Sequence, residues 1–320
     1  MKAAPGECRL CGHQCRADRT QGHLGRCQAG TAAGVAQALL HHGEEPPLSG
    51  VYPAGSGTIF FTRCCLACVF CQNWQISQAP GAGREVAAEE LADIMLSLAE
   101  AGALNINLVS PTPYVPVIAR ALVRAKKQGL ALPVVYNTGG YDSLRALAIM
   151  EGLADIYLPD AKIGRDPLLA EGDPDSRSMR LLGAGDYTAV NRLALKEMLR
   201  QTGHLVLDQD GIARKGLLVR HLVLPDDLAR TSELLPWLAE NLGRQVCLSL
   251  MAQYHPNNRL RQGGDPELRA FPGLTRPLSI REYELAAEQA WNLGLENTFV
   301  QDPSSSGTYI PDFSRPKVFS

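Results

Sequence analysis

The sequence of 320 residues has no marked excess of charge of either sign and few aromatic side chains. It contains 31 lysines and arginines against 33 aspartates and glutamates, for a formal charge of −2, and aromatic residues make up 6%. Such a chain has no global field that would attract nucleic acid or an acidic membrane. We therefore expect no nucleic-acid partner, and a nucleic-acid binder built on a zinc module has little support.

The chain also lacks an uninterrupted apolar run long enough to cross a bilayer. Its first residues, MKAAPGECRLCGHQC, lack the apolar core of a signal peptide. These two absences predict a cytoplasmic protein with no membrane partner. A hydrophobic content of 45% with 20% charged residues is typical of a globular chain with an ample core.

Cysteine is unevenly distributed along the chain. Eight of the nine cysteines fall within the first 71 residues. In a cytosol that keeps thiols reduced, such clustering indicates metal binding rather than disulfides. The ninth, Cys247, stands alone in the apolar run QVCLSL, and we expect it to be a buried core residue.

Short apolar runs alternate with amphipathic helical patterns from residue 57 onward. The apolar runs lie at residues 57–61, 104–110, 132–137, 154–159, 216–224 and 245–251. The helical patterns lie at residues 87–102, 115–129, 143–152, 191–203 and 231–243. This alternation is typical of a parallel sheet covered by helices. Because polar residues cluster just after the strands, we predict an α/β fold, a barrel-like sheet with its site at the carboxyl ends of the strands.

The composition divides the chain into three parts. Residues 1–50 are rich in Cys, Gly and His and show no sustained periodicity, which predicts a small metal-binding module. Residues 51–302 hold the barrel, and within them 252–280 are rich in Pro, Gly and Arg and are expected to form a long loop or lid. Residues 303–320 form a tail, loose or draped over the surface.

Four cysteines crowd the segment after the first predicted strand. They offer two registers: Cys64, Cys68 and Cys71 give C-x₃-C-x₂-C, while Cys65 with the last two gives C-x₂-C-x₂-C. The second register begins the bacterial ferredoxin motif, which needs a fourth cysteine where this chain has Gln75. Three thiolates in one loop therefore remain, a set that leaves one iron of a four-iron cluster open, as a catalytic zinc keeps an open position.

The motif and its surroundings resemble a known family. C-x₃-C-x₂-C with Phe70 before its last cysteine, after the strand GTIFF, resembles the cluster loop of radical S-adenosylmethionine (SAM) enzymes. Together with YNTGGY, DIYLPDAK, VRHLVLP and SLMAQYHP, it is similar to the pyruvate formate-lyase activating enzyme-like group. The resemblance covers nearly the whole chain and implies a partial (β/α)6 barrel of the TIM type. It also implies a [4Fe-4S] cluster on Cys64, Cys68 and Cys71. Cys65 departs from the family pattern; we expect it to be a spectator thiol, and its exchange for Cys64 as a ligand is the alternative.

The same resemblance indicates where SAM binds. The loop SPTP takes the place of a glycine-rich segment that binds the SAM amino group, although its Gly-Gly-Glu form is absent here. Polar residues at the strand ends correspond to positions near SAM. The implied SAM contacts are Ser110, Thr112, Asn137, Asp160, Lys162, Arg220 and His221. Gln253 and His255, after the sixth predicted strand, are further candidates.

The N-terminal module offers a second set of metal ligands. Cys8, Cys11, Cys15 and Cys27 have the spacing C-x₂-C-x₃-C-x₁₁-C. Four cysteines suffice for structural zinc or for a second iron–sulfur cluster, and the spacing does not choose between them. A metal there would fold a segment that is poor in apolar residues.

The leading hypothesis is a radical SAM enzyme that abstracts hydrogen from a protein or peptide, in the manner of glycyl-radical activating enzymes. Such an enzyme needs an external electron donor such as flavodoxin or ferredoxin. An RNA or small-molecule substrate remains an alternative, because the extra module distinguishes this chain. A non-catalytic iron–sulfur electron-transfer protein is a second alternative, which the missing fourth cysteine and the large barrel disfavour.

Overall fold

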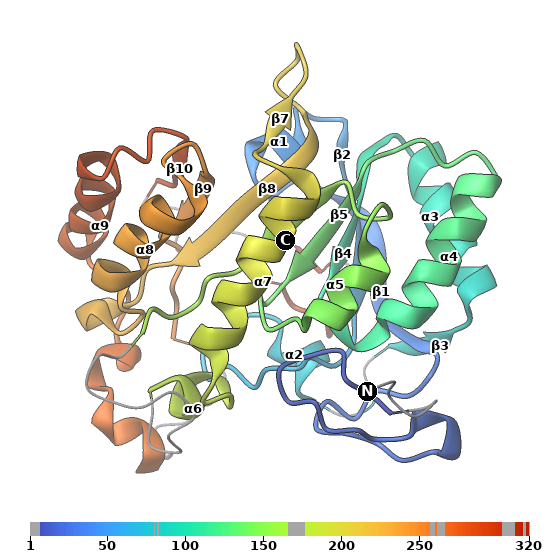
Figure 1. Cartoon of the computed structure of the whole chain (residues 1–320), viewed down its shortest axis with the longest axis horizontal. Helices are drawn as coiled ribbons and strands as arrows, with labels where there is room; N and C mark the ends of the chain where they lie inside the picture. Colours follow the sequence, from blue (N-terminus) through green and yellow to red (C-terminus); the bar gives the residue numbers. More distant parts are fainter. Residues whose placement is uncertain are drawn as a thin grey trace.

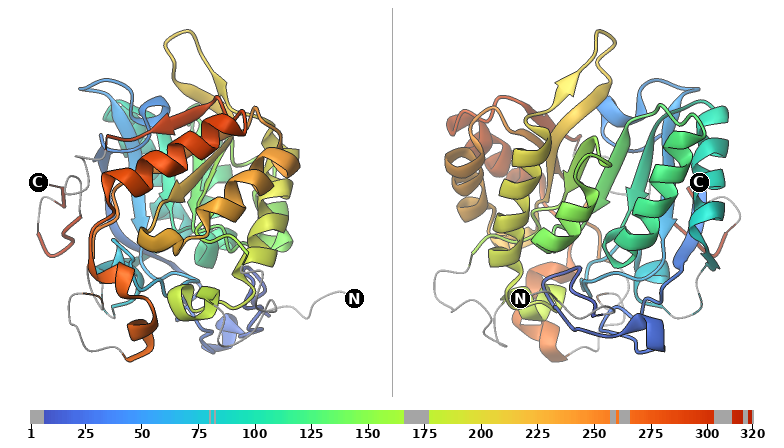
Figure 2. Two further views of the ribbon diagram at one scale, coloured as in Figure 1. Left: turned by 90° about the vertical axis from the view of Figure 1, so that its left-hand side faces the viewer. Right: turned by 45° about the vertical axis from the view of Figure 1, so that its right-hand side comes forward.

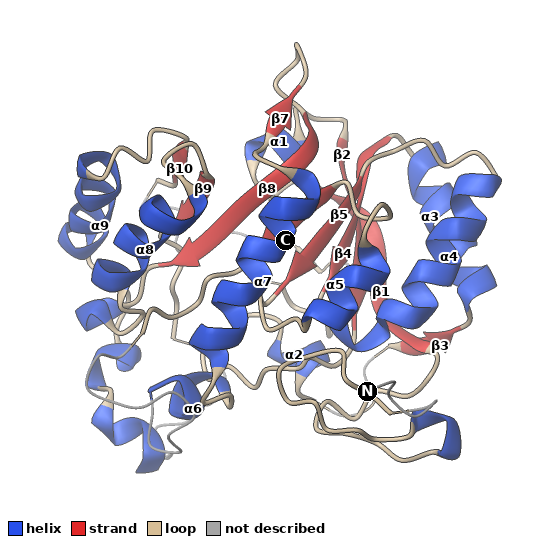
Figure 3. Ribbon diagram, viewed as in Figure 1, coloured by secondary structure: helices blue, strands red, loops and turns tan. Residues whose placement is uncertain are grey.

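The computed structural model describes residues 7–79, 81, 83–165, 177–256, 260, 266–302, 311–315, 318 and 319. Their strands form a ten-stranded sheet in the order β10-β9-β8-β6-β5-β4-β2-β1-β3, with β7 paired to β8 (Figures 1 and 3). The strands are β1 (Ala33–His41), β2 (Gly55–Phe61), β3 (Arg84–Val86), β4 (Ala103–Val109), β5 (Val134–Thr138), β6 (Ile156–Pro159), β7 (Val206–Leu207), β8 (Ala213–Leu222), β9 (Cys247–Met251) and β10 (Thr298–Val300). From β2 to β10 neighbouring strands of this order are parallel.

Helices cover the outer face of the sheet (Figure 2). The longer ones are α3 (Ala88–Glu100), α4 (Val115–Lys127), α5 (Leu144–Met150), α7 (Tyr187–Thr202), α8 (Thr231–Leu242) and α9 (Ile280–Asn292). The short helices are α1 (Pro46–Ser49), α2 (Trp74–Ser77) and α6 (Arg177–Leu182). The 3₁₀ turns are η1 (Arg19–Gln21), η2 (Thr112–Tyr114), η3 (Pro225–Asp227), η5 (Pro266–Ala270) and η6 (Pro272–Thr275). None of the helices in the described ranges is both long and apolar enough to cross a bilayer.

The main hydrophobic core lies between these helices and the outward-facing residues of the strands. Ile59, Leu108 and Tyr136 of the sheet belong to the same buried cluster as Leu91 of α3 and Leu122 of α4. Alternate residues of each strand point to the opposite, inner face, because side chains along a strand alternate between faces. Near the amino ends of the strands this inner face is also apolar, and the fully buried Leu48 of α1 closes it.

All six predicted strands are present, as β2, β4, β5, β6, β8 and β9, and the five predicted helices correspond to α3, α4, α5, α7 and α8. The sheet is parallel-rich and unclosed, consistent with the predicted partial barrel. Cys247 is buried in the inner cluster, as expected.

Strand β1 was not expected from the sequence. It pairs antiparallel with β2 from Val35 to His41 and with β3 from Ala33 to Val35. The N-terminal segment therefore contributes a strand to the main sheet in addition to its cysteine loops. Small and polar residues in AGVAQALLH weaken the alternation that would have revealed it.

The two segments expected to be irregular are ordered where they are described. In the predicted lid, Tyr254 donates a hydrogen bond from its hydroxyl to the carbonyl of Leu274 at 2.6 Å. Residues 257–259 and 261–265 of that lid lie outside the described residues, as do 303–310 of the tail.

Two tail aromatics pack against the edge of the sheet. The ring of Phe319 stacks on His41 of β1 at a centroid distance of 4.2 Å, and Phe313 meets Phe60 of β2 edge-on at 5.4 Å.

Candidate functional site

The cysteine loop follows β2 at the carboxyl end of the sheet and is fixed by backbone hydrogen bonds. The amides of Ala67 and Val69 donate to the carbonyls of Leu182 and Leu181 in α6, at 2.9 and 3.0 Å. The amide of Arg63 donates to Ile76 of α2 at 2.8 Å. Helices on both sides of the loop therefore hold its backbone in one conformation.

The thiols of Cys64, Cys68 and Cys71 are buried or half-buried, and two of them meet hydrogen-bond donors. The amide of Leu66 donates to Cys64 Sγ at 3.4 Å, and the hydroxyl of Ser77 lies 3.4 Å from Cys71 Sγ. Donors of this kind stabilise the sulfurs of iron–sulfur clusters and set their potential.

Burial raises the pKa of all three thiols, that of Cys64 to about 12, while the nearby ammonium of Lys162 opposes this rise at each. Buried thiols of high pKa keep their protons unless a metal replaces them, because metal ligation deprotonates a thiol outright. In a cubane cluster each thiolate binds a different iron, so the three sulfurs need not converge on one point. The three residues therefore fit the implied cluster.

Cys65 makes a contact with the N-terminal segment. Its buried side chain is hydrogen-bonded to that of Cys11 in the N-terminal segment, and this contact is the largest influence on the pKa of Cys65, which is raised. The imidazole of His13 lies 2.9 Å from the carbonyl oxygen of Cys65. Cys65 thus joins the cluster loop to the N-terminal segment.

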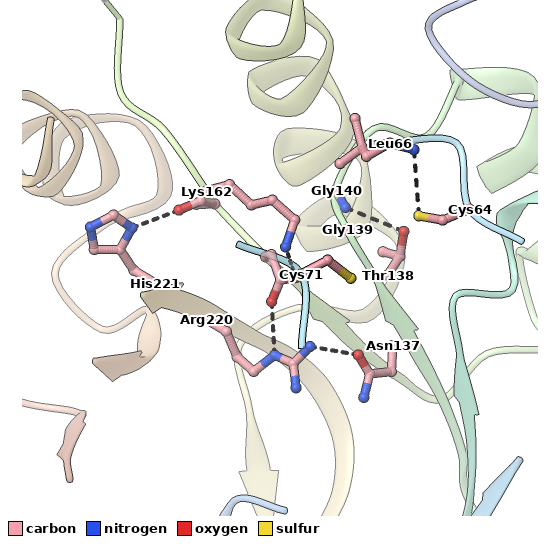
Figure 4. Close-up of polar contacts among 12 residues, drawn as sticks. Cys64, Leu66, Cys71, Asn137, Thr138, Gly139, Gly140, Lys162, Arg220 and His221 are labelled. Atoms are coloured by element: carbon pink, nitrogen blue, oxygen red, sulfur yellow. Dashed lines mark hydrogen bonds and ion pairs between the residues drawn. The ribbon is translucent and has the colours of Figure 1, made fainter. Parts of the chain in front are cut away.

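A network of charges lies beside the cysteine loop at the ends of β5, β6 and β8 (Figure 4). Arg220 donates from Nε to Asp160 Oδ1 at 3.0 Å and from Nη2 to Asn137 Oδ1 at 2.7 Å. Lys162 Nζ lies 2.5 Å from Asp160 Oδ2, and Figure 4 shows its side chain running towards Cys71. One carboxylate therefore holds two cations at the mouth of the barrel.

The protonation states in this network follow from burial and charge. Burial alone would raise the pKa of Asp160, but the guanidinium of Arg220 and the ammonium of Lys162 lower it further than burial raises it. Burial likewise opposes the charged form of Lys162, yet Asp160 raises the pKa of that amine above its usual range. All three side chains are therefore charged at neutral pH.

A cavity of about 170 Å³ opens between the loop and the network. Its lining includes Cys68, Cys71, Asp160, Lys162, Arg220, Met251 and Gln253. It therefore combines two of the three cluster cysteines with both cations, which suits a ligand carrying a carboxylate near a metal. His255 is not among the described residues that line it.

The predicted SAM loop adjoins the cysteines but is occupied by internal bonds. Ser110 has a left-handed backbone with φ of 61°, and its amide donates to the carbonyl of Asn137 at 2.9 Å. The hydroxyl of Thr112 donates to Asp142 Oδ1 at 2.6 Å. That hydroxyl therefore supports the turn, while a narrow gap lined by Ser110, Thr112 and Cys64 remains beside it.

His221 does not reach the site. It lies on the outer face of β8, while Arg220 lies on the inner face, because successive strand residues point to opposite sides. Its Nδ1 lies 2.6 Å from the carbonyl oxygen of Ala161 (Figure 4). Its Nε2 lies 2.8 Å from the hydroxyl of Thr231. The prediction that both residues face SAM is corrected here for His221, whose two nitrogens bind protein groups.

The buried His221 gives stability a dependence on pH. Burial lowers its pKa to about 4 from an ordinary value near 6.5, so its stabilisation is complete above pH 6.5 and declines as pH falls towards 4. We expect this residue to contribute a loss of about 2 kcal/mol in unfolding free energy between pH 7.5 and 5. Urea titrations at both pH values should show a smaller loss in His221→Gln than in the wild type. Equal losses in the two proteins would refute this account.

Two acidic side chains that the sequence analysis did not single out also reach the inner face. Glu44 Oε2 lies 3.6 Å from Arg220 Nη1. Glu45 is buried, its Oε2 has no hydrogen-bond partner among the described residues, and burial raises its pKa to about 7. In the sequence, two adjacent carboxylates before two prolines could have marked these residues as candidates. Their position is seen only in the structure, where the chain before α1 passes beneath the barrel.

The N-terminal cysteines are neighbours of differing exposure. Cys8 and Cys11 are buried, Cys27 is half-buried and Cys15 is exposed. Arg19 Nη2 donates to Cys27 Sγ at 3.3 Å. Within the described ranges, no three His, Cys, Asp or Glu side chains are arranged as a ready single-ion site. A second metal at these cysteines therefore remains a prediction.

A comparison with protein families bears on this arrangement. Residues 58–176, which contain the cysteine loop and run past Lys162, match the model of the radical SAM superfamily. Residues 58–176 are a radical SAM domain. The radical SAM superfamily consists of enzymes and implies a [4Fe-4S] cluster and SAM as cofactors.

Two relatives align with most of the chain, at low sequence identity. The chain is 28% identical over 298 residues to the uncharacterized protein MJ0674 of Methanocaldococcus jannaschii, covering 90% of this chain and 75% of that protein. It is 23% identical over 282 residues to the uncharacterized protein MJ0808 of the same organism, covering 84% and 71%.

Two solved structures are similar to part of this chain. Streptococcus suis SuiB bound to the precursor peptide SuiA matches with a TM-score of 0.47 and 12% identity, over 78% of this chain and 48% of SuiB. The enzyme anSMEcpe with bound AdoMet and the Cp18Cys peptide matches with a TM-score of 0.46 and 8% identity, over 72% and 56%. The chain thus spans about half the length of these structures.

Proposed function

We propose that this chain is a radical SAM enzyme in which Cys64, Cys68 and Cys71 bind a [4Fe-4S] cluster. When bound, the cluster supplies the electron that cleaves SAM to methionine and a 5′-deoxyadenosyl radical, which abstracts hydrogen from the substrate. The observation that carries the proposal is the cavity that places Cys68 and Cys71 opposite Lys162 and Arg220 within a radical SAM domain.

The residues around the cavity have roles in binding and shielding. Lys162 and Arg220 provide positive charge for the carboxylate of SAM, and Asp160 and Asn137 keep Arg220 in position. The fixed loop backbone and the buried wall behind it keep water from the reacting groups, which protects a reactive intermediate from side reactions. Ser110 lies at the gap beside Cys64 and is the remaining candidate contact from the SPTP loop.

We further propose a protein or peptide substrate, an external donor such as flavodoxin or ferredoxin, and a second metal at the N-terminal cysteines. The unclosed sheet supports a protein or peptide substrate, because a partial barrel leaves one side of its inner face without strands. The electron donor follows from the chemistry, since each cleavage of SAM consumes one electron. The proximity of Cys8, Cys15 and Cys27 supports the second metal.

The test is an anaerobic assay of SAM cleavage. The protein is reconstituted with iron and sulfide, reduced with dithionite and mixed with SAM, and 5′-deoxyadenosine is measured by chromatography. We expect product, together with a change in the electron paramagnetic resonance spectrum of the reduced cluster when SAM binds. A cluster that is reduced but shows neither product nor a spectral change would favour the electron-transfer alternative. Iron and zinc analysis of the same sample identifies the N-terminal metal.

A further inference from the structure

A second and larger cavity, of about 410 Å³, lies outside the barrel. Its walls are the N-terminal segment, the start of α4 and the first turns of α5, which Figure 1 shows beside one another. This volume is within the range of small-molecule binding sites. Cys8, a proposed ligand of the N-terminal metal, reaches one wall, but none of the residues proposed for the barrel cluster or for SAM lines the cavity, so SAM cleavage does not account for it.

The walls of this cavity are tied together by hydrogen bonds. Ser143, the N-cap of α5, donates from its hydroxyl to the carbonyl of Arg9 at 2.7 Å and from its amide to the carbonyl of Leu10 at 3.1 Å. Arg19 Nη1 donates to the carbonyl of Pro113 at 2.5 Å, just before α4. The cavity is therefore preformed, which reduces the entropic cost of binding a ligand.

Four arginines line the cavity against a single acidic residue. Glu7 is paired with Arg9 at 2.7 Å, which leaves the other three arginines uncompensated. Arg120 and Arg145 are exposed and make no ion pair or hydrogen bond with the part of the chain that the structure describes. The Nε donors of Arg9 and Arg19 are buried without a partner there as well. Buried donors without partners are rare in folded proteins and call for an explanation such as a ligand.

The start of α4 adds to the positive potential. This 13-residue helix begins at Val115 with no side-chain cap and no acidic residue in its first turn, and its first turn lines the cavity. Pro116 in this turn has no N–H to donate, so the contribution comes from the helix dipole, whose positive end favours an anion. Planar guanidinium groups match phosphate through paired hydrogen bonds.

The rest of the wall is apolar. Leu10, Tyr114, Val117 and Ile149 line it alongside the arginines. We propose that this cavity binds an organic phosphate of nucleotide size, with its phosphates on Arg120 and Arg145 and its body against these apolar side chains. A polycarboxylate shares the charge but lacks the apolar body, so it is the weaker alternative.

The test uses GDP, inorganic pyrophosphate and citrate as probes in calorimetric titrations of the full-length protein without SAM. We expect GDP to bind more tightly than pyrophosphate, and pyrophosphate more tightly than citrate. Loss of a charge-assisted hydrogen bond should weaken GDP binding at least about tenfold in Arg120→Ala and in Arg145→Ala. Arg124→Ala is the matched control, because it removes a cation from the same helix outside the cavity lining.

A further variant locates the binding. Lys162→Met removes a cation from the barrel cavity and should leave GDP affinity unchanged. Absence of GDP binding at millimolar concentration would overturn the proposal. So would binding that is lost in Lys162→Met and kept in both arginine variants. These outcomes are independent of SAM cleavage, so failure here would not count against the proposed enzyme activity.

Discussion

Replacement of Cys64, Cys68 or Cys71 by alanine is expected to abolish SAM cleavage, reducing 5′-deoxyadenosine to the level of protein that was not reconstituted. Each variant loses one of three thiolate ligands from a cluster that already has an open iron. We expect the iron content of reconstituted protein to fall by about four atoms per chain. Iron analysis and product chromatography on the same samples measure both effects.

Cys65→Ala is the matched control for these variants. Its thiol is one residue from Cys64 but contacts Cys11 instead of the cavity. We therefore expect it to keep the barrel cluster and most of its SAM cleavage, as should Cys247→Ala in the inner core. A Cys65→Ala protein that loses the iron while Cys64→Ala keeps it would show that the ligand register begins at Cys65.

Arg220→Met should destabilise the protein by about 3 kcal/mol at pH 7, since it leaves the largely buried Glu44 without its cation and Asp160 paired with Lys162 alone. Arg220 is 17% and Asp160 13% exposed at the side chain, so solvent replaces the lost contacts poorly. Urea unfolding of the wild type and the variant measures the difference. Arg200→Met is the control, because Arg200 is 56% exposed and exposed pairs contribute about 1 kcal/mol or less.

The defect of Arg220→Met should diminish at acid pH. In the wild type the lowered pKa of Asp160 stabilises the fold above the ordinary aspartate pKa, and this share is lost as pH falls through the folded-state value. Against the opposing effect of burial, Arg220 is the largest cause of this lowered pKa, so the variant has lost part of that share while Lys162 keeps the rest. The stabilities of the two proteins therefore converge as pH falls. The double variant with Asp160→Asn should be more stable than the sum of the single changes predicts. Additive effects that do not vary with pH would exclude an ionic role for this pair.

The sequence predicts the parallel strands and the loops that follow them because each strand is buried on both faces. Runs such as GTIFF and LPVVY contain few polar residues, and each is followed by polar residues that the parallel arrangement collects at one edge. This is why Asp160, Lys162 and Arg220 are found together, although the intervals between them along the chain give no measure of distance.

Side-chain direction and long-range packing are less accessible to this reasoning. Arg220 and His221 are adjacent, and the motif does not show which of them faces inward until the register of β8 against β6 is known. The contact between Cys65 and Cys11 joins residues 54 positions apart across two loops, where no periodicity exists. Glu44 reaches Arg220 only because α1 brings its segment beneath the sheet.

The pairing of β1 with β2 determines where the chain can be divided. Removal of residues 1–50 would expose the hydrogen-bonding edge of β2, a strand buried along all seven of its residues. An exposed apolar edge strand is a template for aggregation. A shortened protein for expression or domain exchange must therefore keep Ala33–His41, the strand that covers this edge.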